Sequence, residues 1–298
     1  MAKKSSLASA VKSPYLVPFN GKWRLKDAAH KPPKKAPSGK SGKKKNKESL
    51  AKEVTSLRDL QERLYADDRY SVLLVFQAMD AAGKDGTIRA VMSGINPAGC
   101  QVVSFKRPSS EEIDHDFLWR VHRKTPERGR IGVFNRSHYE EVLVVKVNPE
   151  ILDSQRLPST PKSVFKDRYE SIRDFEHHLA RNGTVIIKFF LNVSRDEQKE
   201  RFLARIDDPE KNWKFEAGDL KVREDWDKYM KAYEQALNET SLPHAPWYVI
   251  PADDKPFMRT TVAGIVRKTL EKLDLQFPDL HDDEIAQLGR YKKALEDE

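Results

Sequence analysis

Residues 72–87 read VLLVFQAMDAAGKDGT and decide the fold. The first five are apolar and rich in β-branched and aromatic types without alternation, which predicts a strand buried on both faces, as in a parallel sheet. Ile88, Val91 and Met92 then recur at helical spacing. A strand, a glycine-containing loop and a helix in this order can hold a phosphate group. The N–H groups at the helix start point at the anion, and a lysine supplies the counter-charge.

The loop matches the G-x-x-x-x-G-K-[ST] pattern only in part. Ala78 stands at the first glycine position, and Asp85 stands where Ser or Thr would hold magnesium. A plain strand-to-helix connection, in which Gly83 eases a tight turn, would explain the same spacing. Asp80 favours the phosphate loop, since a carboxylate inside a phosphate-binding turn costs energy unless a metal ion or a proton-transfer role compensates.

The length and composition of the chain limit the class of protein it can be. A chain of 298 residues can bury a proper core, as one large α/β domain or as two small ones. Charged residues make up 34%, no apolar run is long enough to span a bilayer, and residues 1–14 lack the apolar core of a signal peptide. Cys100 is the single cysteine, which excludes a disulfide framework and a cysteine metal cluster. These features predict a soluble cytoplasmic protein that makes no membrane contact.

Positive charge is concentrated at the N-terminus. Residues 1–47 hold fourteen Lys and Arg against one acidic residue, a balance of +13, so the net charge of +8 leaves −5 for residues 48–298. Residues 15–25 carry aromatic side chains and could pack on the body as an ordered arm. Residues 31–47, KPPKKAPSGKSGKKKNK, predict a flexible linker. A solvated tail is favoured over a specific nucleic-acid contact, and loose steering of a polyanion stays open.

Residues 48–298 are predicted to form the catalytic domain, opening with a helix from about residue 49 to 67. Buried strands are predicted at 72–76, 100–105, 131–134, 184–191 and 247–251, separated by helical sequence. Because there is no internal repeat, this order predicts an α/β fold with a doubly wound parallel five-stranded sheet and helices on both faces.

Polar and basic residues follow two of these strands, at the sheet edge where open α/β folds bind ligands. Lys106 and Arg107 follow the second strand, and Asn135 and Arg136 end the third. A helix cap by Asn135 would explain part of this pattern equally well. The strand ends therefore predict a site for an anionic ligand.

Residues 201–225 are predicted to form a lid. Arg201 and Arg205 lie four residues apart on one helix face, and a charged loop with one Trp follows them. A segment of this kind, flanked by helices, can close over phosphates. A surface helical hairpin stabilised by salt bridges is the alternative.

These parts fit phosphoryl transfer, which needs an in-line arrangement of donor and acceptor, metal ions, and cations on the developing charge. Arg suits the last task because its planar fork contacts two phosphate oxygens. The cations assigned to this role are Lys84, Arg136, Arg205 and Lys214, with Asp80 for the metal or the incoming phosphate.

Four stretches together resemble the polyphosphate kinase 2 family. They are FQAMDAAGKDGT (76–87), SFKRPS (104–109), FNRSHYE (134–140) and DPEKNWK (208–214), and they occur in order within residues 50–252. The resemblance implies a P-loop kinase-like fold similar to thymidylate kinase, with a helical lid. It also implies transfer of phosphate between inorganic polyphosphate and a nucleotide, with Mg²⁺ as cofactor and Mn²⁺ as the alternative metal.

The resemblance assigns roles to single residues. Catalysis is assigned to Asp80, Lys84, Arg136 and Arg205, with Asp80 also as the metal ligand. Binding of the polyphosphate is assigned to Ala81, Ala82, Gly83, Lys84, Asp85, Gly86, Lys106, Arg201, Lys211 and Lys214. Contacts to the nucleotide are assigned to Asp116, Arg120 and Asn135. Many family members have Asp where Asn135 stands, and Asn coordinates a metal more weakly.

The loop and the FNRSHYEE stretch resemble the branch of the family that phosphorylates AMP as well as ADP. Adenine nucleotides are the expected partners, with guanine nucleotides as a second option, and a homo-oligomer (dimer or tetramer) is expected. Two other hypotheses stay open: an ATP-dependent nucleoside or nucleotide kinase on the same scaffold, and a nucleic-acid-binding protein that works through the lysine-rich arm. The second leaves Asp80 and the lid unexplained.

Overall fold

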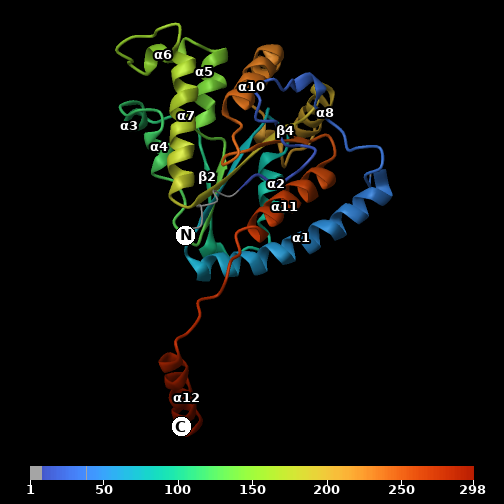
Figure 1. Cartoon of the computed structure of the whole chain (residues 1–298). Helices are drawn as coiled ribbons and strands as arrows, with labels where there is room; N and C mark the ends of the chain where they lie inside the picture. The colour runs from blue at the N-terminus through green and yellow to red at the C-terminus, as the bar shows by residue number, and fades with distance from the viewer. Residues whose placement is uncertain (1–8, 38) are drawn as a thin grey trace.

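A parallel sheet forms the centre of the computed structural model, which describes residues 9–37 and 39–298 (Figure 1). Within these residues the sheet has five strands in the order β2-β3-β1-β4-β5, all paired in parallel. The strands are β1 (Ser71–Gln77), β2 (Cys100–Ser104), β3 (Ile131–Asn135), β4 (Thr184–Asn192) and β5 (Trp247–Pro251). The doubly wound parallel sheet predicted from the sequence is confirmed.

Strand β1 lies in the middle of the sheet, between β3 and β4. Every residue of β1 is buried, as its unbroken apolar run predicts. Phe76 lies opposite Asn135 of β3 and Phe189 of β4, so the carboxyl ends of three strands meet where the phosphate loop begins. Ligands of open α/β sheets bind at this edge.

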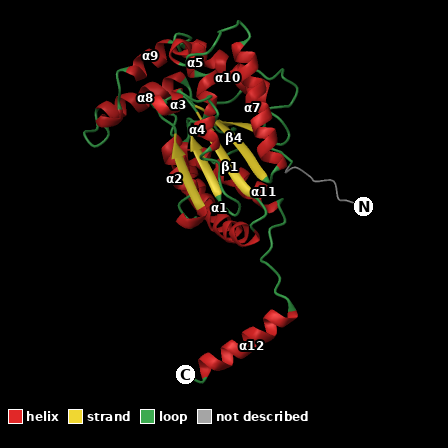
Figure 2. Cartoon of the chain, turned by 90° about the vertical axis from the view of Figure 1, so that its left-hand side faces the viewer, coloured by secondary structure: helices red, strands yellow, loops and turns green. Residues whose placement is uncertain are grey.

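Helices cover both faces of the sheet (Figures 1 and 2). On one face α2 (Lys84–Val91), α11 (Lys255–Glu271) and α1 (Gly39–Asp67) pack together, and on the other α7 (Val164–Arg181) packs with α10 (Trp226–Thr240). The other helices are α3 (Ser110–Ile113), α4 (Trp119–His122), α5 (Val144–Val147), α6 (Ile151–Ser154), α8 (Arg195–Ile206), α9 (Gly218–Glu224) and α12 (Asp282–Glu296). Short 3-10 turns are η1 (Leu25–Asp27), η2 (Pro97–Gly99), η3 (His138–Val142) and η4 (Asn212–Lys214).

Helix α1 begins earlier than the sequence predicted. The segment expected to be a flexible linker is helical from Gly39 onward. Two hydrogen bonds of Asn46 explain this early start. Its side-chain amide donates to the Pro37 carbonyl (3.0 Å), and its backbone carbonyl accepts from the Thr260 hydroxyl of α11 (3.0 Å). The linker prediction is therefore wrong for residues 39–47, where tertiary contacts outweigh composition.

The ordered arm expected at residues 15–25 is confirmed. Val17 and Leu25 are buried in the core, and Leu16 forms an antiparallel bridge with Tyr248 of β5. The arm thereby covers the outer edge of the sheet, which would otherwise present unpaired backbone groups.

Helix α12 lies away from the body at the end of an extended segment (Figures 1 and 2). Its apolar side chains Ile285, Leu288, Tyr291 and Leu295 are all exposed. Among the described residues, none of the helices has both the length and the apolar character needed to cross a membrane.

Candidate active site

The loop between β1 and α2 has the backbone shape of an anion site. Ala81 (φ 59°) and Gly83 (φ 104°) both adopt the left-handed conformation, which is strained for alanine and free for glycine. Gly83 is the N-cap of α2, and the first four N–H groups of a helix have no acceptor within it. The predicted phosphate-binding residues 81–86 therefore form a turn whose free N–H groups and positive helix end favour an anion.

Lys84 is held inside this loop. Its ammonium group donates to the carbonyl of Ala78 at 2.8 Å, so the side chain folds back across the turn. Burial lowers the pKa of Lys84, while the negative charge of Asp80 acts in the opposite direction. A partly desolvated ammonium group beside the free N–H groups is well placed to contact a phosphate oxygen.

Asp80, Arg136 and Glu140 form a row of alternating charge at the end of the loop. Arg136 pairs with Asp80 at 2.8 Å and with Glu140 at 3.5 Å. The carboxylate of Glu140 raises the pKa of Arg136, burial opposes this, and Asp80 raises it further. Arg136 also has a left-handed backbone (φ 63°), a strain of the kind that clusters at functional sites. The structure thus brings together Asp80 and Arg136, two residues that the sequence assigned to catalysis.

Burial raises the pKa of Glu140, and the charges of Arg136 and Lys84 lower it. Arg136 donates to Glu140 through one terminal nitrogen and to Asp80 through the other, so both carboxylates hold the guanidinium group. The sequence analysis gave this residue no role, although its position four residues after Arg136 is a signal for such a pair.

Arg201 does not extend freely into the cleft as a polyphosphate ligand would. Its side chain is 7% exposed, and its guanidinium group donates to the carbonyls of Ala81 (3.1 Å) and Ala82 (2.8 Å) in the loop. It also donates to the carbonyls of Ala252 (2.7 Å) and Asp253 (3.3 Å) after β5. The geometry is that of a brace between the phosphate loop and the β5–α11 connection.

Gln198 is a second brace that the sequence analysis missed. Its side-chain amide donates to the backbone carbonyl of Asp80 at 2.9 Å, and its oxygen accepts from Arg223 of α9 at 3.0 Å. Helix α9 is thereby connected to the loop through one buried side chain. No local pattern marks Gln198, because its partners are 118 and 25 residues away in the chain.

The cations of the lid are less buried. Arg205 donates to the carbonyl of Lys214 at 3.1 Å and lies 3.8 Å from the carboxylate of Asp219. Lys211 is exposed and pairs with Asp208, and Lys214 is exposed beside the ring of Trp213. Burial, followed by the charge of Asp80, raises the pKa of Asp219. The lid therefore carries a carboxylate as well as cations, and this carboxylate lies close enough to Asp80 for the two charges to interact.

The predicted site residues at the ends of β2 and β3 differ in their surroundings. Lys106 is exposed, whereas Asn135 donates to Asp85 at 2.6 Å. Asn135 and Asp85 lie on the rim of a hollow of about 330 Å³, whose other lining residues are Ile88, Arg89, Met92, Val102 and Ser104. Asn135 thus contacts the phosphate-loop helix directly.

Arg120 and Asp116 both make local contacts. Arg120 is buried, donates to the Lys106 carbonyl at 2.8 Å and lies 3.5 Å from Glu112. Asp116 is exposed and accepts from the N–H of Leu118 at 2.9 Å. These contacts hold the segment between β2 and β3, and contact with a nucleotide remains a prediction for both residues.

A metal ion at this site would need oxygen ligands from the substrates. Within the described residues, no group of three or more His, Cys, Asp or Glu could hold a metal ion. Asp80 offers one carboxylate oxygen to Arg136, and its other oxygen has no hydrogen-bond partner among the described residues. One or two carboxylates completed by phosphate oxygens and water are the usual site of Mg²⁺. The residues present fit such an ion.

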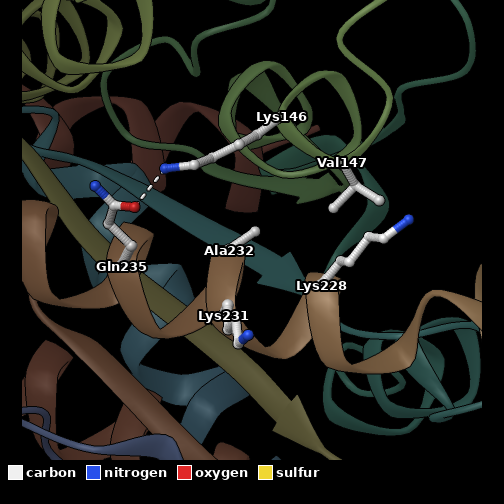
Figure 3. A pocket seen from close by; sticks show the side chains of 6 residues that line it. All are labelled: Lys146, Val147, Lys228, Lys231, Ala232 and Gln235. Carbon is white, nitrogen blue, oxygen red and sulfur yellow. Dashed lines mark hydrogen bonds between the residues drawn. The ribbon is translucent and has the colours of Figure 1, made fainter.

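A separate hollow of about 220 Å³ lies between α5 and α10 (Figure 3). It is lined by Lys146, Val147, Lys228, Lys231, Ala232 and Gln235. Lys146 points at Gln235 and donates a hydrogen bond to it, and Lys228 pairs with Asp225 at 2.6 Å. None of the predicted site residues lines this hollow, so it lies outside the candidate active site.

The chain is similar to known proteins over most of its length. The model of the family described as Polyphosphate kinase 2 (PPK2) matches residues 40–278. An ADP-polyphosphate phosphotransferase of Rhodopseudomonas palustris is 59% identical over 235 residues, which cover 78% of this chain and 81% of the relative. An AMP/ADP-polyphosphate phosphotransferase of Meiothermus ruber is 47% identical over 264 residues, covering 89% and 94%. The crystal structure of polyphosphate kinase 2 from Arthrobacter aurescens superposes with a TM-score of 0.84 at 38% identity, covering 96% and 99%.

Proposed function

Because the chain belongs to the polyphosphate kinase 2 family, we propose that it transfers the terminal phosphoryl group of inorganic polyphosphate to ADP and to AMP. The chain is an enzyme of the kinase type, a polyphosphate-dependent nucleotide phosphotransferase. The Rhodopseudomonas relative is named for ADP, and the Meiothermus relative is named for both AMP and ADP. Both names support a nucleotide mono- or diphosphate as acceptor.

One observation carries the proposal: the Asp80–Arg136 pair (2.8 Å) lies next to a phosphate loop that holds Lys84. The free N–H groups of residues 83–86 and the ammonium group of Lys84 would bind the terminal phosphates of the donor. Arg136 would contact the transferring group, because its fork can bind two oxygens at once. Donor and acceptor then meet at the carboxyl edge of the sheet.

The reaction itself asks little covalent chemistry of the protein. A terminal oxygen of the acceptor forms the new P–O bond, the bond to the bridging oxygen of the polyphosphate breaks, and the donor becomes one phosphate shorter. Lys84 and Arg136 stabilise the charge on the transferring group, and closure of the lid excludes water. Arg205, on the lid, is proposed as a third cation for this charge.

Family membership implies a divalent metal ion, and we assign it as Mg²⁺, with Mn²⁺ as the alternative. Asp80 would hold it through its free oxygen. When bound, the ion neutralises charge on the phosphate oxygens. Arg136 fixes the other oxygen of Asp80 and so orients the ligand.

The test is nucleotide formation with polyphosphate as the only phosphate donor and without ATP. We expect ATP from ADP, and ADP from AMP. In Asp80→Asn and Lys84→Ala the rate should fall by at least about a thousandfold, because the first weakens the ligand of the metal ion and the second removes a cation from the transferring group. Chromatographic separation of the nucleotides measures both acceptors in one assay.

Matched controls are Asp59→Asn and Lys52→Ala, the same chemical changes on the exposed surface of α1. They should retain the activity of the unchanged protein. No product with polyphosphate, together with turnover once ATP and a nucleoside monophosphate are supplied, would refute the proposal and leave an ordinary nucleotide kinase in its place.

We also propose a cytoplasmic location, because nucleotide acceptors are held there. A homo-oligomer, dimer or tetramer, is also proposed, supported by the exposed apolar side chains of α12. Light scattering during gel filtration would distinguish these states from a monomer.

A further inference from the structure

Helix α12 has an apolar face that the rest of the chain leaves open to solvent. Four large side chains recur at intervals of three or four residues and therefore share this face: Ile285, Leu288, Tyr291 and Leu295. They are between 53% and 69% exposed. Phe277 and Leu280, in the segment that leads to the helix, are exposed as well. A continuous apolar stripe of this kind marks a surface that another molecule covers.

The last firm contact of this segment with the body lies before α12. Leu275 is buried, and the N–H of Gln276 donates to the carboxylate of Asp67 at 3.0 Å. Every residue from Phe277 onward is exposed. Both views show α12 apart from the sheet and its covering helices (Figures 1 and 2). The body of the same copy therefore does not cover the apolar face.

The length of α12 is a second reason to expect a partner. A helix of 15 residues is only marginally stable in water, and most helices gain their stability by packing an amphipathic face. Glu284 accepts from the N–H of His281 at 2.8 Å, and Lys292 lies 3.7 Å from Glu296. These contacts are local and exposed, so burial of the apolar face would supply most of the stability of α12.

The apolar positions of α12 are symmetric about Leu288. Ile285 lies three residues before it and Tyr291 three residues after it. Two copies of the helix that run antiparallel with Leu288 opposite Leu288 would therefore place Ile285 of each copy opposite Tyr291 of the other. Leu295 would then reach the segment that holds Leu280 of the other copy. The face can thus be buried against itself around a two-fold axis, as in isologous dimers.

The charged positions are symmetric about the same point, with opposite signs. Glu284 and Lys292 each lie four residues from Leu288, and Asp283 and Lys293 each lie five residues from it. An antiparallel pair would bring each acid of one copy opposite a lysine of the other, whereas a parallel pair would bring like charges together. Acids first and lysines later also suit the dipole of a single helix. Their equal spacing about the centre of the apolar face adds the complementarity between copies.

We propose that α12 pairs antiparallel with α12 of a second copy of this chain, through the face centred on Leu288. The inference deepens the homo-oligomer proposed above by naming a contact, and it does not depend on phosphoryl transfer. A lipid surface would select a helix whose polar face is rich in Lys and Arg. Residues 282–296 instead hold four acidic residues against three basic ones, which matches a second copy of the same helix.

The first experiment compares Leu288→Gln with Ala286→Gln in the full chain. Both are single changes to Gln at exposed positions of α12, but two residues of separation place them on opposite sides of the helix. Leu, Ala and Gln are all good helix formers, so neither change breaks the helix by propensity. Sedimentation equilibrium from about 1 to about 100 µM chain measures the dissociation constant over the range of a weak to moderate dimer.

We expect Leu288→Gln to raise the dissociation constant at least about tenfold, because each pair of helices loses two buried leucines. In a tetramer the same change would leave dimers. Ala286→Gln should assemble like the unchanged chain. Circular dichroism of both variants checks that the body stays folded.

The second experiment reverses the charges on one side of Leu288 at a time. Asp283→Lys/Glu284→Lys leaves α12 with lysines on both sides, and Lys292→Glu/Lys293→Glu leaves it with acids on both sides. Each variant alone should assemble less than the unchanged chain, because like charges would then meet in the antiparallel pair. Mixing the two should restore assembly as a mixed pair, which native mass spectrometry identifies. Loss of helical structure alone would not be repaired by mixing.

Equal dissociation constants for Leu288→Gln and Ala286→Gln would overturn the pairing, as would charge variants that mixing does not restore. If the unchanged chain is an oligomer and every variant stays so, the homo-oligomer stands on another surface and this contact fails. A monomer at about 100 µM would refute both. None of these measurements uses turnover, so failure of the proposed phosphoryl transfer would not change their outcome.

Discussion

The Lys188–Glu176 ion pair beneath the Arg136 segment, called the floor of the site below, is buried in a hydrogen-bonded network, whereas the Lys211–Asp208 pair in the loop of the lid is local and open to water. Beneath the Arg136 segment, Lys188 of β4 and Glu176 of α7 are both almost fully buried and lie 2.5 Å apart. Lys188 also donates to the Tyr139 hydroxyl and the Thr240 carbonyl, each at 2.8 Å. In the lid, the Lys211–Asp208 pair is exposed.

The apolar residues differ in the same way. The core beneath the floor includes Phe134, Tyr139 and Phe189, which are fully buried, while Trp213 in the lid is 73% exposed and Ile206 is 47% exposed. A buried network with most partners satisfied holds one arrangement, and a segment with few buried contacts opens at low cost. The comparison therefore predicts that the floor is formed before substrate binds and that the lid closes only when substrate is present.

The largest effect is expected from breaking the buried pair on one side only. Lys188→Met should lower the free energy of unfolding by about 3–5 kcal/mol, because Glu176 is left as an uncompensated buried charge. Lys188→Met/Glu176→Gln removes both charges and should recover most of this loss. Chemical denaturation of both variants measures the difference, and equal stabilities would show that the pair does not organise the floor.

The second-largest loss of stability is expected from removing the brace at Arg201. Arg201→Ala should lower the free energy of unfolding by about 2–4 kcal/mol, since several buried carbonyls lose a charged donor. Activity should fall with it, because the loop loses its connection to the β5–α11 segment. Hydrogen exchange of residues 78–86 would report the loosened loop, and unchanged protection there would argue against a brace.

In the lid, Arg205→Ala should separate activity from stability. We expect kcat to fall about 10- to 100-fold, the share of one cation in stabilising the transferring group. The free energy of unfolding should change by no more than about 0.5 kcal/mol, as at other partly exposed positions. A loss of stability as large as that of Arg201→Ala would mean that Arg205 belongs to the framework.

The stability of the floor should also depend on pH, through Lys188. Burial lowers the pKa of Lys188 from 10.5 to about 8, against the charge of Glu176. Between these two values the unfolded chain keeps the Lys188 proton and the folded chain loses it, so stability rises with pH.

Relative to Lys188→Met/Glu176→Gln, the unchanged protein should gain at most about 2 kcal/mol from pH 8 to about pH 9.5. Denaturation at several pH values measures this difference. Parallel pH profiles for the two proteins would contradict the lowered pKa.

The smallest effect is expected at the surface of the lid. Lys211→Ala breaks the exposed pair with Asp208 and should change the free energy of unfolding by no more than about 0.5 kcal/mol. Its KM for polyphosphate tests the predicted contact in the closed state. A shift in stability like that of the buried floor pair would remove the contrast between the two regions.

Much of the fold could be predicted because its signals are local. The apolar run before the loop predicts β1, and Gly83 with Lys84 predicts the turn and the helix after it. Each depends on residues that are neighbours in the chain. The start of α1 was missed because composition indicates a linker there, whereas Thr260, 214 residues away from Asn46, holds it as a helix.

The features of the candidate site also divide into those with a local sequence signal and those without one. The sequence alone determined that this chain has a parallel sheet, a phosphate loop at its central strand, and Asp80, Lys84 and Arg136 at the sheet edge, since strand order and side-chain spacing are properties of short segments. Only the tertiary structure decided that Arg201 braces the loop, that Gln198 connects it to the lid, and that the start of α1 packs against α11 through Asn46 and Thr260. These depend on which distant backbone carbonyls and side chains meet after packing, and no local pattern carries that information.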